Sequence, residues 1–441
     1  MNWQEHYKSR LVSPEEAMQV VKSNDTIFLS QPEPMALGLA LASRGPELTG
    51  VKIMGGGGAD LPMYEPSWYD AFPDSFKIET PYVLPLIREL FNVKKADYVI
   101  SGLFGVPDTI PEKPIDLYII QISPPDHNGF CSFGNSVWRK KDWARAAKTV
   151  IGEVNERCIR TYGDNFIHVS EIDYFIEHTP TGKIPGGTDI LGRKSTGPGE
   201  LQRTIAQHIG TLIKDGDCLE IGVGGTAEWV AQLDVLDSKH ELGWHSENTV
   251  RGIGSLVMKG VITGKYKNLH PGKAVATAVG GGTKEEMDFI NGNPLFEVYG
   301  SNYILDPRII GAHDNMVAIN SAMAVDLTGQ IAAESIGPVM TSGSGGQLAF
   351  AIGANLSKGG RNIVAVASTA KGGTMSRIVP MFEQGTIVST PRTLANYVVT
   401  EYGVASLKGK TQKERAGELI AVAHPDFRAE LKKEAERIYG T

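Results

Sequence analysis

Short apolar runs alternate with amphipathic stretches along most of the chain, and the first such unit shows the pattern. Residues 13–16 read Ser-Pro-Glu-Glu, which places an N-cap serine before a proline at the first helical position and a glutamate three residues after the serine. This pattern predicts a helix that runs to about Lys22. The apolar run at 25–30 predicts a buried strand, and a second helix is expected to begin near Met35.

The same order of helix, turn and strand returns in the second half of the chain. Residues 20–30 read VVKSNDTIFLS and residues 212–222 read LIKDGDCLEIG, so the lysine, the aspartate and most apolar positions coincide. One match of this length can arise by chance, because helix–turn–strand units look alike. Since the two copies lie near the start of each half, we favour an internal duplication.

A stretch of low periodicity separates the two halves. Residues 178–200 are rich in Gly, Pro, Ser and Thr, a composition typical of a connection between domains. A chain of 441 residues is also long for a single core. We therefore predict an N-terminal domain at 1–190 and a C-terminal domain at 191–441.

Further strands and helices are predicted on both sides of this connection. The expected strands are 52–54, 97–101, 117–122, 149–154, 166–169, 274–279, 296–299, 316–319, 363–367, 386–389 and 397–400. The expected helices include 84–91, 137–147, 411–423 and 425–438. Alternation of strands with helices favours parallel sheets, so the predicted fold class is α/β, with two tandem open α/β domains.

Composition narrows the class of protein. Apolar content of 41% and charged content of 21% are typical of soluble globular proteins, and a net charge of -7 offers no polybasic patch for nucleic acid or membrane. No apolar run is long enough to span a bilayer, and the first ten residues lack the apolar core of a signal peptide. The three scattered cysteines disfavour a disulfide framework or structural zinc, so a cytoplasmic location is expected.

Glycine is more frequent in this chain than in an average globular protein. The chain has 51 glycines, and clusters follow apolar runs at 55–58, 222–225, 280–282, 343–346 and 372–373. An open α/β sheet places ligand-binding loops after its strands, and glycine lets the backbone approach a ligand closely. One such cluster can be an ordinary turn, but their recurrence favours binding loops.

The tripeptide His245-Ser246-Glu247, within GWHSENTVRG at 243–252, is the leading candidate for chemistry. A Ser-His-Asp triad is disfavoured because no GxSxG elbow precedes a histidine, and a metal site is disfavoured because the histidines lack HExxH or other ligand spacing. A dinucleotide loop is disfavoured because IGVGGTAEWV departs from GxGxxG. A polar loop without catalytic role stays open.

The carboxylate of Glu247 suggests acyl transfer. A carboxylate is a poor nucleophile in water, but it becomes competent when a closed site desolvates it and aims it at an activated acyl group. Attack on a thioester produces an oxyanion, which needs preorganised donors. The backbone N–H groups of residues 222–226 and 343–347 are candidates for these donors.

Several long strings resemble one known family over nearly the whole chain. They are SPPDHNGFCSFG at 123–134, GDNFIHVSEID at 163–173, AQHIGTLIKDGDCLEIGVGG at 206–225, INSAMAVDLTGQIAAESIG at 319–337, SGSGGQLAF at 342–350, STAKGGTMSRIVP at 368–380 and the run at 398–427. Through them the chain resembles the family I coenzyme A transferases, in particular the acetyl-CoA hydrolase/transferase group that includes 4-hydroxybutyrate CoA-transferase.

The resemblance implies two similar α/β domains with the active site between them. It implies ping-pong transfer, in which Glu247 forms an acyl–glutamyl anhydride and then a glutamyl–CoA thioester. Coenzyme A thioesters and small carboxylic acids are then the substrates, with no permanently bound cofactor and no metal. The resemblance also implies a homo-oligomer, either a dimer or a tetramer.

Other residues receive roles from the same resemblance. The oxyanion and CoA-binding positions are Gly222, Val223, Gly224, Gly225, Thr226, Ser342, Gly345 and Gly346. The carboxylate pocket is assigned Glu401 and an asparagine, for which Asn302 and Asn320 compete. Glu401 has an alternative role as a cap or ion-pair partner, and Asn320 has one as a brace at a strand end.

One position departs from the family pattern. After the nucleophile many members read Met-x-x-Asp-Gly, whereas residues 248–252 read Asn-Thr-Val-Arg-Gly. Arg251 is either a solvent-facing loop residue or a bidentate partner for a second substrate carboxylate. The second alternative favours a dicarboxylate substrate over 4-hydroxybutyrate or butyrate. With this arginine the chain resembles the itaconate CoA-transferase branch, in which succinyl-CoA or acetyl-CoA would serve as donor. An acyl-CoA hydrolase and a CoA-binding regulatory protein are the alternative functions.

Overall fold

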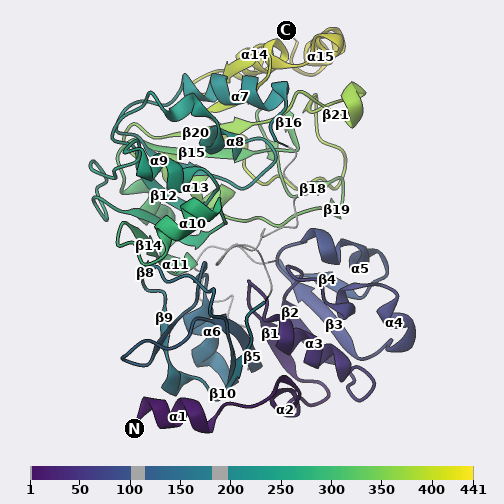
Figure 1. Ribbon diagram of the computed structural model, residues 1–441. Coiled ribbons are helices and arrows are strands. Elements are labelled where there is room, and N and C mark those ends of the chain that lie inside the picture. Colours follow the sequence, from purple (N-terminus) through teal and green to yellow (C-terminus); the bar gives the residue numbers. More distant parts are fainter. Residues whose placement is uncertain (1, 101–114, 181–196, 441) are drawn as a thin grey trace. The chain divides into compact units, whose positions relative to one another are not determined.

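The computed structural model describes residues 2–100, 115–180 and 197–440 (Figure 1). The chain forms two compact units, of which the first comprises Met1–Arg193 and Thr277–Asn302, and the second Lys194–Ala276 and Tyr303–Thr441. The sequence division at residue 190 places residues 277–302 in the C-terminal domain, whereas the structure places this segment in the first unit. Most of the predicted connection, residues 181–196, lies outside the described residues.

A seven-stranded sheet forms the centre of the first unit, in the order β10-β7-β5-β1-β2-β3-β4, and its neighbouring strands are parallel. The strands are β1 Thr26–Leu29, β2 Val51–Gly55, β3 Phe76–Thr80, β4 Ala96–Tyr98, β5 Ile115–Ile122, β7 Ala147–Val154 and β10 Tyr174–Glu177. Ile27 and Leu29 contribute to one apolar layer, and Phe28 and Tyr118 to another. Burial on both faces explains why these strands read as continuous apolar runs.

The first unit contains further helices and strands outside this sheet. They are α1 Trp3–Ser9, α2 Pro14–Met18, α3 Met35–Ser43, α4 Trp68–Ala71, α5 Arg88–Asn92, α6 Lys140–Ala146, α10 Lys284–Ile290, β6 Phe130–Ser132, β8 Tyr162–Gly163, β9 Phe166–His168 and β14 Phe296–Val298. Strands β6 and β9 pair antiparallel, and β8 and β14 pair parallel. Strand β13 Ala274–Val279 and helix α11 Ser301–Ile304 lie where the chain passes between the units.

The second unit is built on strands in the order β25-β24-β20-β15-β11-β12, of which all adjacent pairs are parallel except β24 with β25. The strands are β11 Cys218–Ile221, β12 Gly243–Thr249, β15 Met316–Ser321, β20 Arg361–Ala365, β24 Tyr397–Thr400 and β25 Gly403–Ser406. Its helices are α7 Glu200–Gly210, α8 Trp229–Gln232, α9 Ile253–Met258, α12 Pro307–Gly311, α13 Gln347–Leu356, α14 Gln412–Val422 and α15 Pro425–Tyr439. The mainly parallel α/β architecture confirms the predicted fold class.

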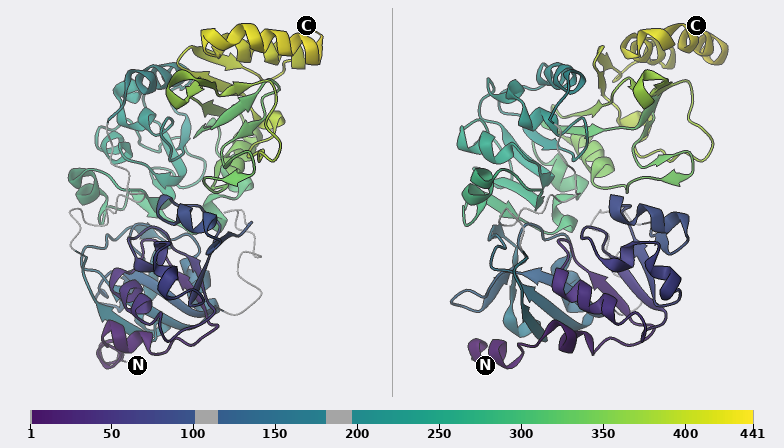
Figure 2. Two further views of the ribbon diagram at one scale, coloured as in Figure 1. Left: turned by 90° about the vertical axis from the view of Figure 1, so that its right-hand side faces the viewer. Right: turned by 45° about the vertical axis from the view of Figure 1, so that its right-hand side comes forward.

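Small sheets and C-terminal helices complete the second unit. The short strands are β16 Ala324–Asp326, β17 Ile331–Ala332, β18 Ser335–Ile336, β19 Val339–Met340, β21 Thr369–Ala370, β22 Met375–Ser376 and β23 Ile378–Val379. Helices α14 and α15, yellow in Figure 2, lie together at the C-terminal end of the chain. Among the residues that the structure describes, no helix is long and apolar enough to cross a membrane.

The two matching sequence stretches form the same turn. The carboxylate of Asp25 accepts the N–H of Lys22 at 2.8 Å, and the carboxylate of Asp217 accepts the N–H of Lys214 at 2.6 Å. The residue before each aspartate has a positive φ, 68° at Asn24 and 77° at Gly216. The strand after each turn is also central, because β1 lies between β5 and β2 as β11 lies between β15 and β12.

Three local expectations differ from the structure. The helix predicted at 13–22 ends at Met18, although the predicted capping box between Ser13 and Glu16 is present. Residues 386–389 are not a strand: the side chains of Ile387 and Val388 are exposed, and the Ile387 N–H bonds to the Ser335 hydroxyl. The stretch around Glu247 was expected to be a loop, but it forms strand β12, whose residues 243–246 are all buried.

Helices α12 and α13 approach closely through two glycines. A Cβ atom on Gly353 would lie 2.4 Å from Ile310 Cβ, and one on Gly311 would lie 2.9 Å from Leu356 Cβ. The missing side chains therefore allow α13 to pack against α12. This packing helps to set the position of the α13 N-terminus, which begins at Gly346.

We expect Gly353→Ala to lower the free energy of unfolding by about 1–3 kcal/mol, because the added methyl group meets Ile310 in a packed core. Gly417→Ala is the matched control, since Gly417 also lies within a helix and nothing approaches its Cβ position within 4 Å. The control should gain up to about 1 kcal/mol from helix propensity. Chemical denaturation of both variants checks the difference, and equal shifts would contradict the interlocked packing.

Candidate active site

Glu247 lies near the carboxyl end of the parallel strand β12, on the face that carries His245. The His245 ring lies 6.1 Å from the Phe350 ring on α13, so this helix covers that face of the sheet. Strand β11 runs beside β12 with Cys218 opposite Gly243, which puts Glu220 on the same face. Asn320 of β15 joins them by a hydrogen bond to Glu220. The face therefore holds a polar cluster of Glu220, Glu247 and Asn320.

The N-terminus of α13 contacts Glu247 directly. The Gly346 N–H donates to Glu247 Oε2 at 2.5 Å, and Gly346 is the N-cap residue of α13. A Cβ atom on Gly346 would lie 2.4 Å from the same oxygen. Only glycine therefore lets the carboxylate reach this N–H. The helix dipole also favours a negative charge at that point.

Burial has a large effect on the acidity of Glu247. It raises the pKa of the Glu247 carboxyl group to about 7, and the hydrogen bond from Gly346 opposes the shift. The side chain is partly buried. Near neutral pH this residue therefore exists as a mixture of carboxylate and acid, and partial desolvation makes the carboxylate more reactive.

The glycine loop after β11 begins beside the polar cluster. Gly222 donates its N–H to Ile319 O at 2.9 Å, so this group is already used by the sheet. The N–H groups of Val223, Gly224 and Gly225 have no acceptor among the described residues. Thr226 continues the loop, and the Ala227 N–H bonds to the Ser321 hydroxyl. The predicted oxyanion donors are therefore available at Val223, Gly224 and Gly225, but not at Gly222.

Glu220 is the residue that the sequence reasoning missed. It is 1% exposed, and its Oε2 accepts the Asn320 side-chain N–H at 2.8 Å and the Ile319 N–H at 3.2 Å. Burial and the nearby charge of Glu247 raise the pKa of the Glu220 carboxyl group well above its usual range. An acid within the apolar strand CLEI was the available signal.

Asn320 braces the strand ends, as one of its two predicted roles requires. Its Oδ1 lies 2.1 Å from the position of a Cβ on Gly222, so only glycine fits there. Its amide group holds Glu220 and does not point into open space. Asn302, its competitor, is exposed on α11 at the edge of the other unit, and no described contact joins it to Glu247.

Glu401 and Arg251 have different surroundings from Glu247. The Glu401 carboxylate accepts the Ser368 N–H at 3.0 Å and the Ser368 hydroxyl at 2.5 Å. Arg251 follows β12, is exposed, and has no ion pair among the described residues. Ser342 and Gly345 precede α13, and the Ser342 N–H donates to Glu334 O at 3.2 Å. The structure thus brings Gly346, but neither Glu401 nor Arg251, into contact with Glu247.

The histidine and serine before Glu247 have structural partners. His245 Nε2 faces Ile304 O at 3.0 Å, and its Nδ1 faces His313 Nε2 at 3.3 Å. The Ser246 hydroxyl donates to Asn248 O at 3.0 Å, and Ser246 lies on the opposite face of β12 from His245. This geometry does not place a serine nucleophile beside a histidine base.

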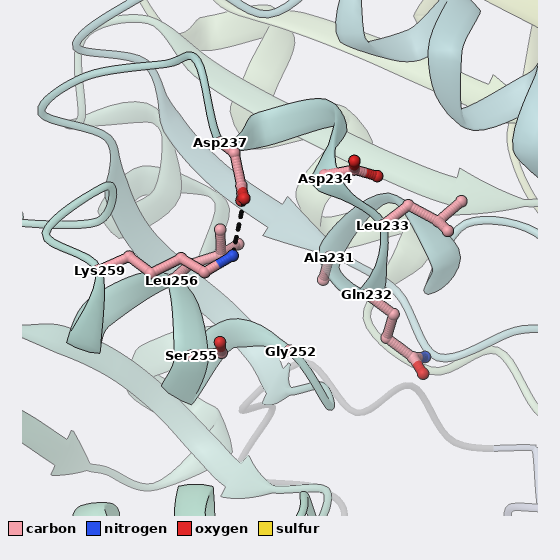
Figure 3. Close-up of a pocket in the computed structure, with 9 residues that line it drawn as sticks. All are labelled: Ala231, Gln232, Leu233, Asp234, Asp237, Gly252, Ser255, Leu256 and Lys259. Carbon is pink, nitrogen blue, oxygen red and sulfur yellow. Dashed lines mark hydrogen bonds and ion pairs between the residues drawn. The ribbon is translucent and has the colours of Figure 1, made fainter.

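A cavity of about 260 Å³ lies elsewhere in the second unit (Figure 3). It is lined by residues of α8, α9 and the segment between α8 and β12, and the Lys259 ammonium bonds to the Asp237 carboxylate at 2.7 Å across it. Glu247 does not line this cavity. Glu247 instead contacts the N-terminus of α13.

Comparison with known proteins identifies the family. Sequence profiles of the acetyl-CoA hydrolase/transferase N-terminal and C-terminal domains match residues 1–182 and 282–435. A 4-hydroxybutyrate coenzyme A transferase of Clostridium kluyveri is 41% identical, and the match covers 99% of this chain and 100% of that protein. A succinyl-CoA:cyclohexane-1-carboxylate CoA transferase of Geobacter metallireducens is 37% identical, with 99% and 97% covered.

Solved structures agree with this relationship. The crystal structure of RipA from Yersinia pestis matches with a TM-score of 0.89 at 32% identity and covers 100% of both chains. The 4-hydroxybutyrate CoA-transferase of Porphyromonas gingivalis matches with a TM-score of 0.77 at 33% identity and covers 99% of this chain and 100% of that one. The chain belongs to the acetyl-CoA hydrolase/transferase family, and it is an enzyme that transfers coenzyme A.

Proposed function

We propose that the protein is an acyl-CoA:carboxylate CoA-transferase that carries coenzyme A covalently on Glu247. The observation that carries this proposal is the contact between a partly buried carboxylate and the N-terminal N–H of α13. The pKa of about 7 also supports it, because a carboxyl group of this acidity is both ionisable at neutral pH and poorly solvated.

In the first half-reaction, a Glu247 carboxylate oxygen attacks the carbonyl carbon of the acyl-CoA thioester. The tetrahedral oxyanion collapses, the C–S bond breaks, and an acyl–glutamyl anhydride and CoA thiolate form. The thiolate then attacks the glutamyl carbonyl carbon. The anhydride C–O bond breaks, the acyl group departs as the first carboxylate, and a glutamyl–CoA thioester forms. A second carboxylate reverses these steps, and no net proton is gained or lost.

Backbone donors at the start of α13 and in the loop after β11 suit the charges that develop. The Gly346 N–H at the start of α13 is positioned to stabilise an oxyanion on the glutamyl group, where the helix dipole adds to its effect. We assign the N–H groups of Val223 to Gly225 to the oxyanion of the attacked thioester, because they have no acceptor among the described residues. Exchange of one thioester for another is nearly isoenergetic, so this enzyme has no need of ATP.

For the acid substrates we propose short-chain or small dicarboxylic acids. Two relatives are named for 4-hydroxybutyrate and for cyclohexane-1-carboxylate, and another is named for butyryl-CoA and acetate. We retain Glu401 and Asn302 as candidates for the acid pocket. The exposed guanidinium of Arg251, four residues after Glu247, favours itaconate or succinate if it meets a second carboxylate.

Mass spectrometry tests the covalent carrier. Wild-type protein mixed with acetyl-CoA or succinyl-CoA, without an acceptor acid, is expected to gain a CoA-sized adduct on the peptide that contains Glu247. Glu247→Gln should form no adduct and lose transfer by several orders of magnitude, because a neutral amide cannot attack. Glu430→Gln, at an exposed position of α15, is the control and should behave as wild type. CoA transfer by Glu247→Gln at the wild-type rate would contradict the proposed mechanism.

The same experiment separates transferase from hydrolase. In a transferase the adduct persists until an acceptor acid arrives. Steady release of free CoA without an acceptor would instead mean that water resolves the intermediate, and the acyl-CoA hydrolase alternative would hold.

Adduct formation should depend on pH through Glu247. The acid form cannot attack, so the rate is expected to fall as the pH drops below about 7 and to rise towards a plateau above it. Rapid-quench measurement of the adduct at a series of pH values checks this. A midpoint near the ordinary glutamate value of about 4.3 would contradict a desolvated nucleophile.

Arg251 offers a test of the acid substrate. If its guanidinium binds a second carboxylate, Arg251→Gln should raise KM for itaconate and succinate at least tenfold more than KM for butyrate, since only dicarboxylates lose a charged pair (about 1.4 kcal/mol per tenfold). Arg437→Gln, another exposed arginine, should leave these values unchanged. An equal change in KM for all acids would indicate that Arg251 is a solvent-facing residue that does not bind the substrate.

A further inference from the structure

The second unit contains a buried acid, Glu220, that the transfer reaction described above does not use. Its strand is otherwise apolar, and its side chain lies on the face covered by α13. A buried acid costs stability unless it is neutral or well paired. The structure shows no ion pair between Glu220 and a basic side chain among the described residues.

The duplicated backbone shows that this acid is not required by the fold. The matching turns align Glu220 with Phe28, and the strand registers on either side then align Glu247 with Gly56 and Asn320 with Ile120. In the first unit Phe28 packs between Tyr118 and Trp143, the latter from helix α6. In the first unit, apolar Phe28 and Ile120 therefore stand at the positions that Glu220 and Asn320 hold in the second unit.

Hydrogen bonds leave one oxygen of Glu220 able to carry a proton. Oε2 accepts two N–H groups, from Asn320 and Ile319, as a carboxyl C=O oxygen would. Oε1 lies 3.6 Å from the position of a Cβ on Gly222, at the start of the glycine loop. A neutral carboxyl group with its proton on Oε1 thus satisfies every contact that the structure shows for this side chain.

Glu247 is the main source of charge that faces Glu220. The other titratable groups on this face are Cys218 on β11, His245 on β12, and His313 and Lys267 next to His245. Burial keeps both histidines neutral, with the pKa of His313 at about 3, and raises the pKa of the Cys218 thiol to about 12. The Lys267 ammonium donates to Trp244 O and Lys273 O. Strand β15 and helix α13 carry no titratable side chain.

We propose that Glu220 is a positioning residue that retains a proton while Glu247 is ionised, so that this pair of carboxyl groups carries at most one negative charge. The inference rests on the proposed role of Glu247 as nucleophile. A second charge would repel the carboxylate substrate and the CoA thiolate, both of which are anions that must approach Glu247. The ionisation of Glu220 thus sets the alkaline limit of the pH range in which the site accepts them.

Two consequences follow from the reciprocity of the coupling between the two acids. When the pH rises far enough for Glu220 to ionise, adduct formation should slow. When Glu247 becomes a neutral thioester, Glu220 loses the charge that opposes its ionisation. Adduct formation from ionised Glu247 releases no proton, so a proton that appears with the adduct at a pH well above 7 has to come from a linked group such as Glu220.

The first experiment measures the rate of CoA-adduct formation from acetyl-CoA or succinyl-CoA between neutral and alkaline pH. Wild type is expected to lose about tenfold per pH unit beyond an alkaline limit. Glu220→Gln preserves the acceptor oxygen for Asn320 and Ile319, and its rate should stay level over the same range. Glu430→Gln, the exposed control, should keep the alkaline limit. An unchanged limit in Glu220→Gln, or an equal loss at every pH, would overturn the proposal.

The second experiment needs only wild-type protein and therefore does not depend on the folding of a variant. In weakly buffered solution with a pH indicator, adduct formation should release up to one proton per site as the alkaline limit is approached. Absence of proton release at alkaline pH, where Glu247 is already ionised, would overturn the role of Glu220 even with a normal adduct on Glu247. Absence of the adduct in wild type would overturn the proposed function, and this inference with it.

Discussion

The short hydrogen bond from the Gly346 N–H to the Glu247 carboxylate is the contact on which the candidate site depends. It requires strand β12 to bring Glu247 to the carboxyl edge of the sheet, and α13 to begin at a residue without a side chain. The packing of α13 on α12 through Gly353 and Gly311 supports that position. A carboxylate at a helix N-terminus is electrostatically favourable, yet its partial burial keeps it reactive. The site therefore combines a stabilised position with a poorly solvated charge.

Duplication explains how one backbone supports two different interiors. Both units place a central strand after the same aspartate-capped turn, with equivalent neighbours on each side. In the first unit the corresponding positions hold Phe28, Ile120 and Gly56, and the face under α6 is packed with aromatic rings. In the second unit they hold Glu220, Asn320 and Glu247 under α13. The parallel sheet thus supplies the geometry, and a few substitutions at the ends of its strands supply the chemistry.

Two acids on one face of the sheet, Glu220 fully buried and Glu247 partly buried, lower the stability of the folded protein. Burial raises both of their pKa values, so the folded protein is less stable once the pH exceeds the ordinary glutamate value than it would be with neutral side chains. That cost is reduced by hydrogen bonds from Asn320, Ile319 and Gly346, which satisfy the oxygens that face the sheet and the helix. Such strain is typical of functional sites and not of cores, which are built to be stable.

Much of this protein was readable from the order of its residues. Apolar periodicity, capping boxes and glycine clusters are local signals, and they predicted the α/β class, the repeat and the loop after β11. Long strings spread over nearly the whole chain indicated the family. The sequence did not reveal that Glu247 lies in a strand or that residues 277–302 return to the first unit. It also did not reveal that Glu220 lies beside Glu247, because the register between β11 and β12 joins residues far apart in the chain. Those features depend on which strands pair and which helix covers them, and only tertiary structure decides that.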